Sequence, residues 1–149
     1  MRLNAELEEL RAASNVCVCQ SLRKASRATT QLYDRHLGPS GLTTVQFSVL
    51  LKLRENHPMT MSELAKRLLM DRTTLTRNLE LLVDMGLVEP RRGKDRRTRY
   101  VSLTPKGDAA VGTALPLWAE AQSHMAAGLG SDQWRDLGQA LRKAIAAVS

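Results

Sequence analysis

The chain has 149 residues, and 22 Lys and Arg against 15 Asp and Glu give it a formal net charge of +7 and a pI near 10. The length suits one domain, no apolar run approaches the roughly 20 residues of a membrane span, and the acidic, helical N-terminus is unlike a signal peptide. We therefore expect a cytoplasmic protein, unattached to a membrane, whose partner is acidic, with nucleic acid the first candidate.

The predicted core is aliphatic and the predicted fold mainly α, because the chain is rich in Ala and Leu and has one Phe, two Tyr and two Trp. The first predicted helix is long. Leucines at positions 3, 7 and 10 begin its pattern, and a second apolar register continues it over residues 18–32. Pro and Gly within residues 38–41 end this helix. Either Thr43 or Thr44 then caps a short second helix.

Two further predicted helices are separated by a very short turn. Thr60, with Glu63 three residues on, predicts a capping box at the start of the third helix, and Asp71 caps the fourth. Gly86 suits the left-handed position that ends the fourth helix. The apolar stripe expected to face the core from this helix consists of Leu75, Leu79, Leu82 and Val83.

A β-hairpin is predicted over residues 87–104, because two apolar and β-branched runs flank a strongly basic segment. This tip must project into solvent or against a polyanion, since six cations and one anion cannot be buried there. The charged residues are Arg91, Arg92, Lys94, Asp95, Arg96, Arg97 and Arg99. Helix, turn, helix and basic hairpin, in this order, predict a winged helix-turn-helix, which indicates duplex DNA as the partner.

Two helices complete the predicted fold. Thr104 and Pro105 open the fifth helix, which Pro116 should kink, and the sixth carries an apolar row of Trp134, Leu137, Leu141, Ile145 and Val148. We expect one winged helix-turn-helix unit over 1–149, with a DNA-binding lobe at 42–104 and dimerisation helices at 1–37 and 105–149. The apolar terminal helices favour a twofold dimer, the alternative being that they fold back on their own chain.

The fourth helix is the predicted recognition helix, whose N-terminal end enters the major groove. Its threonine hydroxyls can bond phosphates or base edges, its arginines can reach guanine or phosphate, and its backbone N–H groups can approach phosphate closely. The candidate contacts are Arg72, Thr73, Thr74, Thr76 and Arg77. The alternative is the solvated face of an ordinary helix, which the adjacent basic hairpin makes less favoured.

The hairpin tip is expected to use its charges in two ways. Asp95 can hold the Arg97 guanidinium in one orientation through a bidentate pair, and a pre-aimed arginine suits the narrow, strongly negative minor groove. The remaining cations would lie along flanking phosphates and supply affinity and salt dependence rather than sequence choice. They are Arg91, Arg92, Lys94, Arg96 and Arg99.

Over about residues 20–148 the chain resembles the MarR family of bacterial transcriptional regulators. The resemblance rests on residues 71–77 (DRTTLTR), 81–88 (LLVDMGLV), 95–97 (DRR) and 101–107 (VSLTPKG). It implies a triangular homodimer in which the first, fifth and sixth helices of both chains interleave. It also implies binding to pseudo-palindromic operators in double-stranded DNA, usually as a repressor, with Arg97 in the minor groove and Asp95 buttressing it.

The expected function is therefore that of a homodimeric, sequence-specific DNA-binding transcriptional regulator. The alternative is a non-specific architectural DNA-binding protein, which would use the same phosphate contacts. An enzyme is not expected, because the sequence offers no Ser/His/Asp set, metal triad or Gly-rich phosphate loop. No cofactor and no metal site is expected.

The regulatory signal is expected to be a small aromatic ligand, bound between the dimer helices and the winged part as the resemblance implies, or an oxidant. Cys19 lies fourteen residues before Tyr33, the spacing of the reactive Cys and its Tyr partner in the organic-hydroperoxide-sensing branch of that family. That branch has a second Tyr where this chain has Arg23. On an intact helix Cys17 and Cys19 would point about 200° apart, which disfavours a mutual disulfide or a shared metal. Both thiols could equally be small packed hydrophobes.

Overall fold

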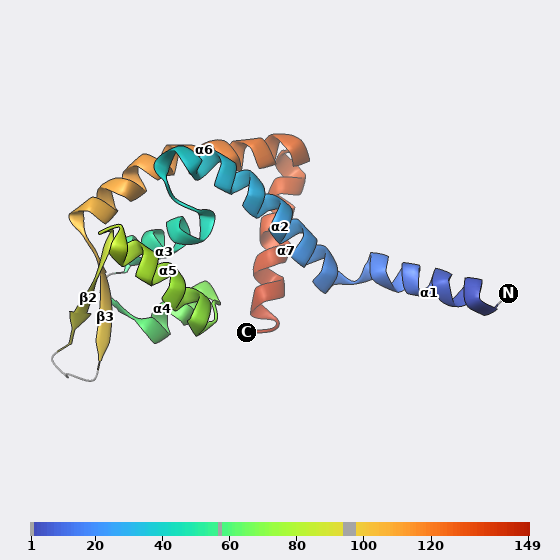
Figure 1. The fold of residues 1–149 in the computed structure, drawn as a ribbon. Coiled ribbons are helices and arrows are strands. Elements are labelled where there is room, and N and C mark those ends of the chain that lie inside the picture. The colour runs from blue at the N-terminus through green and yellow to red at the C-terminus, as the bar shows by residue number, and fades with distance from the viewer. Residues whose placement is uncertain (1, 57, 94–97) are drawn as a thin grey trace.

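The computed structural model describes residues 2–56, 58–93 and 98–149 (Figure 1). Its helices are α1 (Arg2–Val16), α2 (Val18–Leu37), α3 (Thr44–Glu55), α4 (Met61–Leu68), α5 (Arg72–Asp84), α6 (Pro105–Leu129) and α7 (Ser131–Ala146), with a 3-10 turn η1 (Gly38–Ser40) after α2. Its strands are β1 (Met59–Thr60), β2 (Val88–Arg92) and β3 (Arg99–Leu103). They form one sheet in the order β1-β3-β2. The fold is thus mainly α with a small β wing, which confirms the predicted class.

The N-terminal helix is interrupted, which corrects the single long helix predicted from the sequence. Cys17 has extended backbone angles (φ −69°, ψ 104°) and separates α1 from α2. The valines on either side of it, Val16 and Val18, have low helix propensity and are 76% and 67% exposed. The break therefore falls where neither propensity nor packing supports a continuous helix.

The helices α3, α4 and α5 begin at satisfied side-chain caps. Thr43 and Thr60 each form a reciprocal capping box with the residue three positions on, and Asp71 caps α5. These starts confirm the predicted caps and decide between the two threonines at α3. Thr44 instead ties α3 to α2, because its N–H and its hydroxyl both donate to Asp34 Oδ1 at 2.6 Å.

The sheet contains a short strand that the sequence pattern does not reveal. β1 has two residues and pairs with β3, so that Met59 faces Val101. A two-residue strand is too short to show an alternating pattern, so its formation depends on tertiary pairing. β2 and β3 pair along their whole lengths and end on the pair Arg92 and Arg99. These two residues therefore belong to the strands rather than to the loop between them.

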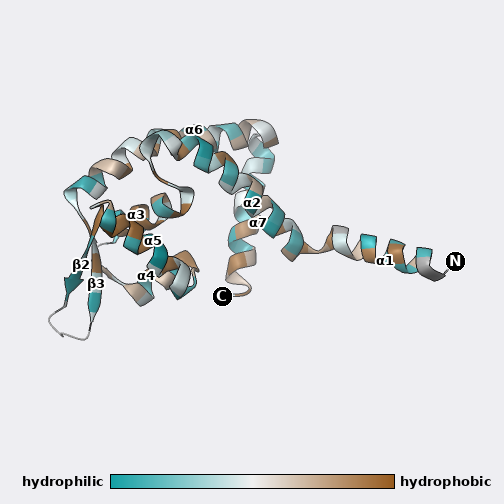
Figure 2. Cartoon of the chain, in the orientation of Figure 1, coloured by the Kyte–Doolittle hydropathy of each residue, from teal (hydrophilic) through white to brown (hydrophobic). Residues whose placement is uncertain are grey.

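One hydrophobic core joins the winged part to the flanking helices. Leu37 of α2 and Val111 of α6 lie in the same buried cluster as the residues of α3, α4 and α5, and the rings of Phe47 and Trp118 are 6.3 Å apart. Figure 2 shows apolar segments gathered where α3, α5 and the strands meet. The largest fully buried side chains of α3, α4 and α5 are Phe47, Leu50, Leu53, Leu64, Leu75 and Leu82. The division into a lobe at 42–104 and separate dimerisation helices stays a prediction.

Val83 lies at the edge of this core, contrary to the predicted stripe on α5. Its side chain is 40% exposed, whereas Leu75, Leu79 and Leu82 are buried. The three leucines share one arc of the helix, and Val83 is turned about 100° from Leu82. In this position Val83 lines a groove between α5 and the strands.

The two C-terminal helices leave a large apolar surface uncovered. α6 continues through Pro116, and its ribbon curves over α3 (Figure 1). α7, which the structure describes throughout, has no buried residue. Its row Leu137, Leu141 and Ile145 is between 37% and 48% exposed. Val148, which was predicted to continue this row, lies beyond the end of α7 at Ala146. The chain therefore does not cover the apolar face of its own last helix. No described helix has the length and apolar character needed to cross a membrane.

Candidate nucleic-acid interface

The turn between α4 and α5 is tight. Leu69 has a left-handed backbone (φ 48°), and the Met70 N–H donates to the Ala65 carbonyl at 3.0 Å. The chain then passes directly into the Asp71 cap of α5. A left-handed conformation is unfavourable for leucine. Here it reverses the chain direction at the end of α4, so that α5 can begin three residues later.

The N-terminal end of α5 uses part of its predicted contact set internally. The Thr74 N–H donates to Asp71 Oδ1 (2.8 Å) and the Thr74 hydroxyl to Asp71 Oδ2 (2.6 Å). These hydrogen bonds lower the pKa of Asp71, so they favour the ionised form of the carboxyl group at the helix start. The Thr76 hydroxyl donates to the Arg72 carbonyl at 2.7 Å. The Thr74 N–H is thus engaged by Asp71, so among the backbone N–H groups at this helix start it is not open to phosphate.

Exposure divides the five predicted residues of α5. Arg72, Thr73, Thr74 and Arg77 are exposed, whereas Thr76 is half-buried. Thr76 faces the strands, where it lines the groove that α5 forms with the wing. The exposed four can reach a ligand directly, and Thr76 can do so from within the groove.

This groove brings the recognition helix and the wing together. Arg72 lines it from α5, and Arg99 and Tyr100 line it from β3. Arg72 and Arg99 also line an adjoining hollow near the start of α4. Two arginines from distant parts of the sequence therefore line one groove, while Glu80 and Asp84 line it farther along α5.

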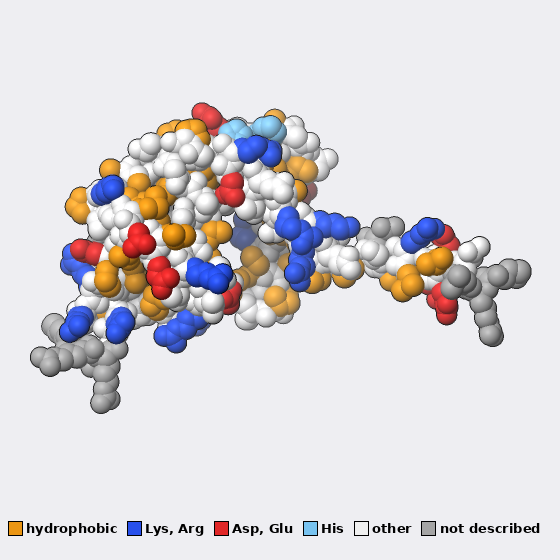
Figure 3. Space-filling view, viewed as in Figure 1, with side chains coloured by type: hydrophobic (Ala, Val, Ile, Leu, Met, Phe, Trp, Pro, Cys, Tyr) orange, Lys and Arg blue, Asp and Glu red, His pale blue; other side chains and the backbone are white. Residues whose placement is uncertain are grey.

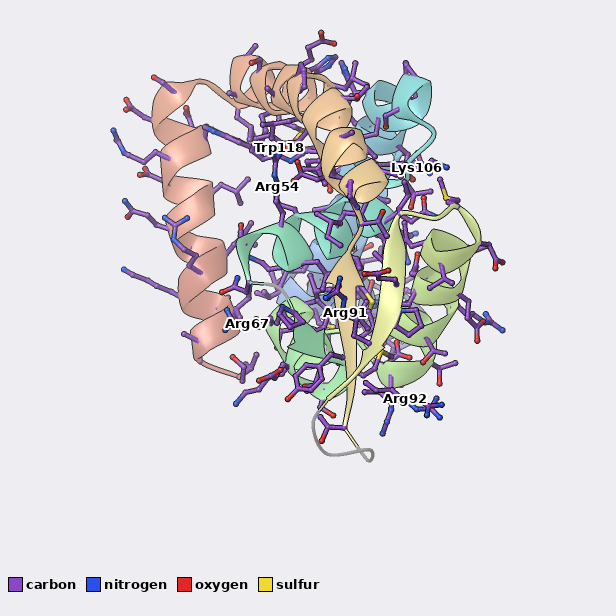
Figure 4. All side chains as sticks on the ribbon, turned by 90° about the vertical axis from the view of Figure 1, so that its left-hand side faces the viewer. Arg54, Arg67, Arg91, Arg92, Lys106 and Trp118 are labelled. Atoms are coloured by element: carbon purple, nitrogen blue, oxygen red, sulfur yellow. The ribbon has the colours of Figure 1, made fainter. Side chains whose placement is uncertain are left out.

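The strand register separates the arginines of the wing into two groups. Arg92 lies directly opposite Arg99, and like charges in facing positions destabilise a sheet. Arg91 lies opposite Tyr100, and its Nε and Nη2 donate to Glu89 Oε1 at 2.9 and 2.7 Å. In Figure 4 Arg91 and Arg92 project on opposite sides of the hairpin. An anion beside Arg92 and Arg99 would relieve their repulsion, whereas Arg91 already has a carboxylate.

Arg72 and Arg99, which line the groove, and the nearby Arg77 and Arg92 are not engaged by carboxylates of the described residues. Figure 3 shows Lys and Arg side chains around the lower end of the hairpin and α5. The Gly93 N–H donates to the Thr98 carbonyl at 3.1 Å, which joins the strands just before the tip. The predicted tip residues Lys94, Asp95, Arg96 and Arg97 lie outside the described residues, so the pairing of Asp95 with Arg97 stays a prediction.

Two hydrogen bonds that the sequence analysis did not predict hold the C-terminal end of α5 against the start of α6. The Lys106 ammonium donates to the Met85 carbonyl (2.7 Å) and the Thr104 hydroxyl to the Gly86 carbonyl (2.8 Å). These bonds satisfy carbonyl groups at the C-terminal end of α5 and fix α5 to the start of α6. Thr104 was predicted as a helix cap, and it does accept from the Gly107 N–H. The residue in the sequence that could have indicated these bonds is the lysine directly after the Thr-Pro helix start.

The two cysteines lie differently from the prediction. Cys17 is half-buried at the break between α1 and α2, and Cys19 is exposed in the first turn of α2. Because Cys17 has an extended backbone outside the helix, the separation of about 200° that the two thiols would have on an intact helix does not hold here. Tyr33 is half-buried, which raises its pKa. Along α2, fourteen residues span about 21 Å, so Cys19 and Tyr33 can approach each other only between two copies of the chain.

A capped helix pair followed by a two-stranded wing defines a winged helix-turn-helix protein. A family model described as "MarR family" matches residues 40–98. The structure is similar to the transcriptional regulator MosR of M. tuberculosis in complex with DNA, which is 43% identical, with 89% of this chain and 99% of that chain covered and a TM-score of 0.75. It is also similar to a MarR mutant of E. coli complexed with operator DNA, at 28% identity, 89% and 96% coverage and a TM-score of 0.80.

The sequence itself has curated relatives. An uncharacterised HTH-type transcriptional regulator of Bacillus cereus is 36% identical over 95 residues, which are 64% of this chain and 63% of that protein. The match thus spans less than two thirds of that relative. The chain belongs to the MarR family.

Proposed function

We propose that the protein is a homodimeric, sequence-specific DNA-binding transcriptional regulator that acts as a repressor. The observation that carries the proposal is the convergence of Arg72 from α5 and Arg99 from β3 on one groove. A polyanion that contacts both α5 and the wing would neutralise them together. MosR, similar over 99% of its own chain, is in complex with DNA, and the cytoplasm is where a bacterial regulator meets its operator.

The homodimer follows from the uncovered helices. The exposed row of Leu137, Leu141 and Ile145 on α7 is the kind of contiguous apolar surface that an interface buries. A twofold dimer closed on this surface would carry two recognition helices. Helices that read successive turns of one duplex lie about 34–36 Å apart, so the operator should be a palindrome with half-sites one turn apart.

Two signals could release the DNA. A hollow of about 280 Å³, lined by residues of α2, α3, α6 and α7, is the candidate site for a small aromatic ligand. Its lining is Thr29, Thr30, Tyr33, Thr44, Met125, Trp134, Leu137 and Leu141. The second signal is an oxidant acting on the exposed Cys19, with Cys17 two residues away.

Binding to a palindromic promoter fragment tests the proposed function. Fluorescence anisotropy with excess competitor DNA should give operator affinity at least about a thousandfold above that for random DNA. Equal affinity for both would identify the alternative, an architectural DNA-binding protein.

Peroxide treatment then separates the signals: oxidant should release wild type but not Cys19→Ser if the thiol is the sensor. If both proteins stay bound, the aromatic ligand is the signal to pursue.

A further inference from the structure

Leu69 has a backbone conformation that this chain otherwise gives to glycine. Among the residues that the structure describes, those with a positive φ are Leu69 (48°) and three glycines at the ends of helices, Gly41 (74°), Gly86 (71°) and Gly130 (85°). A left-handed conformation brings the Cβ of leucine too close to a backbone carbonyl oxygen, whereas glycine has no Cβ. The sequence therefore keeps a leucine at a position where glycine would be less strained.

The Leu69 side chain gains little packing in return for this strain. The neighbouring side chains of Leu68 and Met70 pack against the hydrophobic core, but that of Leu69 is 60% exposed. The hydrogen bonds of the turn come from backbone groups, because the Leu69 N–H donates to the Lys66 carbonyl at 3.3 Å and the Met70 N–H to the Ala65 carbonyl at 3.0 Å. Glycine could make the same bonds. Strain that the fold does not require is typical of functional positions, so we expect the side chain to contact something outside the chain.

The surroundings of Leu69 indicate what that partner is. Lys66 and Arg67, in the last turn of α4, and Arg72, the first residue of α5, are exposed cations. In Figure 1 the turn between α4 and α5 lies on the lower side of the winged part, as do the lower ends of β2 and β3. The N-terminal end of a recognition helix is the part that enters the major groove of DNA. Leu69 therefore lies among cations at the edge of the proposed DNA-binding surface.

The chemistry of leucine limits which feature of DNA it can contact. Its side chain has no hydrogen-bond donor or acceptor, so it cannot bind a phosphate or a polar base edge. The apolar group that the major groove presents is the C5-methyl group of thymine. Burial of one such group raises affinity by about fourfold.

We propose that Leu69 is a specificity-determining residue, whose side chain contacts the methyl group of one thymine in each operator half-site. The cations around Leu69 bind phosphates and supply affinity without sequence choice, so the leucine adds what they lack. This contact is the reason that a strained leucine stands in the turn instead of glycine. The proposal deepens the proposed function and rests on it, because it requires DNA at the N-terminal end of α5.

Shortening the side chain tests the contact. Leu69→Ala keeps a Cβ, and therefore the strained backbone, but removes the atoms that reach the base. It should weaken binding to the palindromic promoter fragment by about fourfold or more per half-site, measured by fluorescence anisotropy. The matched control is Leu115→Ala in the middle of α6, where an exposed leucine (41%) lies outside the proposed DNA-binding surface. The control should change affinity by less than about twofold, and an equally small effect of Leu69→Ala would overturn the proposal.

Leu69→Gly separates a DNA contact from a structural role. Glycine relieves the strain of the turn, so the urea midpoint of unfolding should rise. Glycine also lacks the side chain, so operator affinity should fall as it does in Leu69→Ala. A side chain that only supported the turn would lower stability and affinity together. That result, or a gain in stability without a loss of affinity, would overturn the proposal.

Replacement of single thymines identifies the base. Deoxyuridine lacks the C5-methyl group of thymidine and is otherwise the same, so it replaces each thymine of the operator in turn, symmetrically in both half-sites. At one position the replacement should weaken wild type by about fourfold per half-site and Leu69→Ala by less than about twofold. Equal losses for the two proteins at every position would overturn the thymine contact and leave the proposed function standing. Equal affinity of wild type for operator and random DNA would overturn both.

Discussion

Gly107 of α6 lies against Leu87, the residue that leads from α5 into β2, so closely that a Cβ at position 107 would stand 2.0 Å from the Leu87 carbonyl oxygen. The same carbonyl accepts the Thr104 N–H at 3.1 Å. Together with the Lys106 and Thr104 bonds to the end of α5, this contact holds the recognition helix, the wing and α6 as one unit. A movement of α6 would therefore be passed directly to α5 and the wing.

Gly107→Ala should lower the free energy of unfolding by about 2–3 kcal/mol, because the added methyl group overlaps backbone rather than a movable side chain. The matched control is Gly112→Ala in the same helix, where a Cβ would meet nothing within 4 Å. The control should stabilise the protein by about 0.5–1 kcal/mol through helix propensity. Urea unfolding measures both, and equal effects of the two substitutions would contradict the contact.

Removing the converging guanidinium groups should weaken operator binding. Arg72→Ala with Arg99→Ala should lower the slope of log affinity against log salt by about 2, since two phosphate contacts are lost. Arg91→Ala is the control, because Arg91 faces the other side of the hairpin and is held by Glu89. We expect a smaller change in slope from this variant, and a larger one would place the DNA on the opposite face.

The hairpin tip carries a prediction that comes from the sequence. Arg97→Ala should weaken operator binding by about 1–3 kcal/mol and leave the dimer intact. Asp95→Ala should also weaken binding, although it removes a negative charge beside the DNA, because the carboxylate orients Arg97. Tighter binding by Asp95→Ala would show that Asp95 acts through charge alone.

The left-handed turn before α5 offers a stability test. Leu69→Gly should raise the free energy of unfolding by about 1 kcal/mol, because glycine adopts a positive φ without the steric cost that leucine has. Leu69 is 60% exposed, so little packing is lost. Leu68→Gly, one residue earlier within α4, should destabilise the protein. Destabilisation by Leu69→Gly as well would mean that its exposed side chain supports the turn.

The cap of the recognition helix should make stability depend on pH. Hydrogen bonds to Thr74 lower the pKa of Asp71 in the folded protein, so its contribution is present above the unfolded pKa. It is lost as the pH falls from about 5 through the lowered folded pKa. Asp71→Asn keeps a capping oxygen without a titrating group. The stability difference between wild type and Asp71→Asn should therefore shrink on acidification, and a constant difference from pH 7 to pH 2 would refute this.

The sequence by itself determined the order and the starts of most elements. Thr60 and Asp71 are strong local signals, because a helix start needs a side-chain acceptor for its free N–H groups, and both predicted starts are confirmed. The two apolar and β-branched runs around a basic segment were also a local signal, and so was the glycine after α5, which has φ 71°. Local chemistry of this kind can be read without knowing what lies nearby in space.

Only the tertiary structure decided what depends on distant contacts. The strand β1 forms because Met59 finds Val101, and Val83 faces a groove because of where the wing lies. The break at Cys17 falls between two exposed valines, Val16 and Val18, which have no packing that would favour a continuous helix. Above all, Arg72 and Arg99, 27 positions apart in the chain, line one groove. Their convergence depends on the packing angle of α5 against the sheet, which no local pattern specifies.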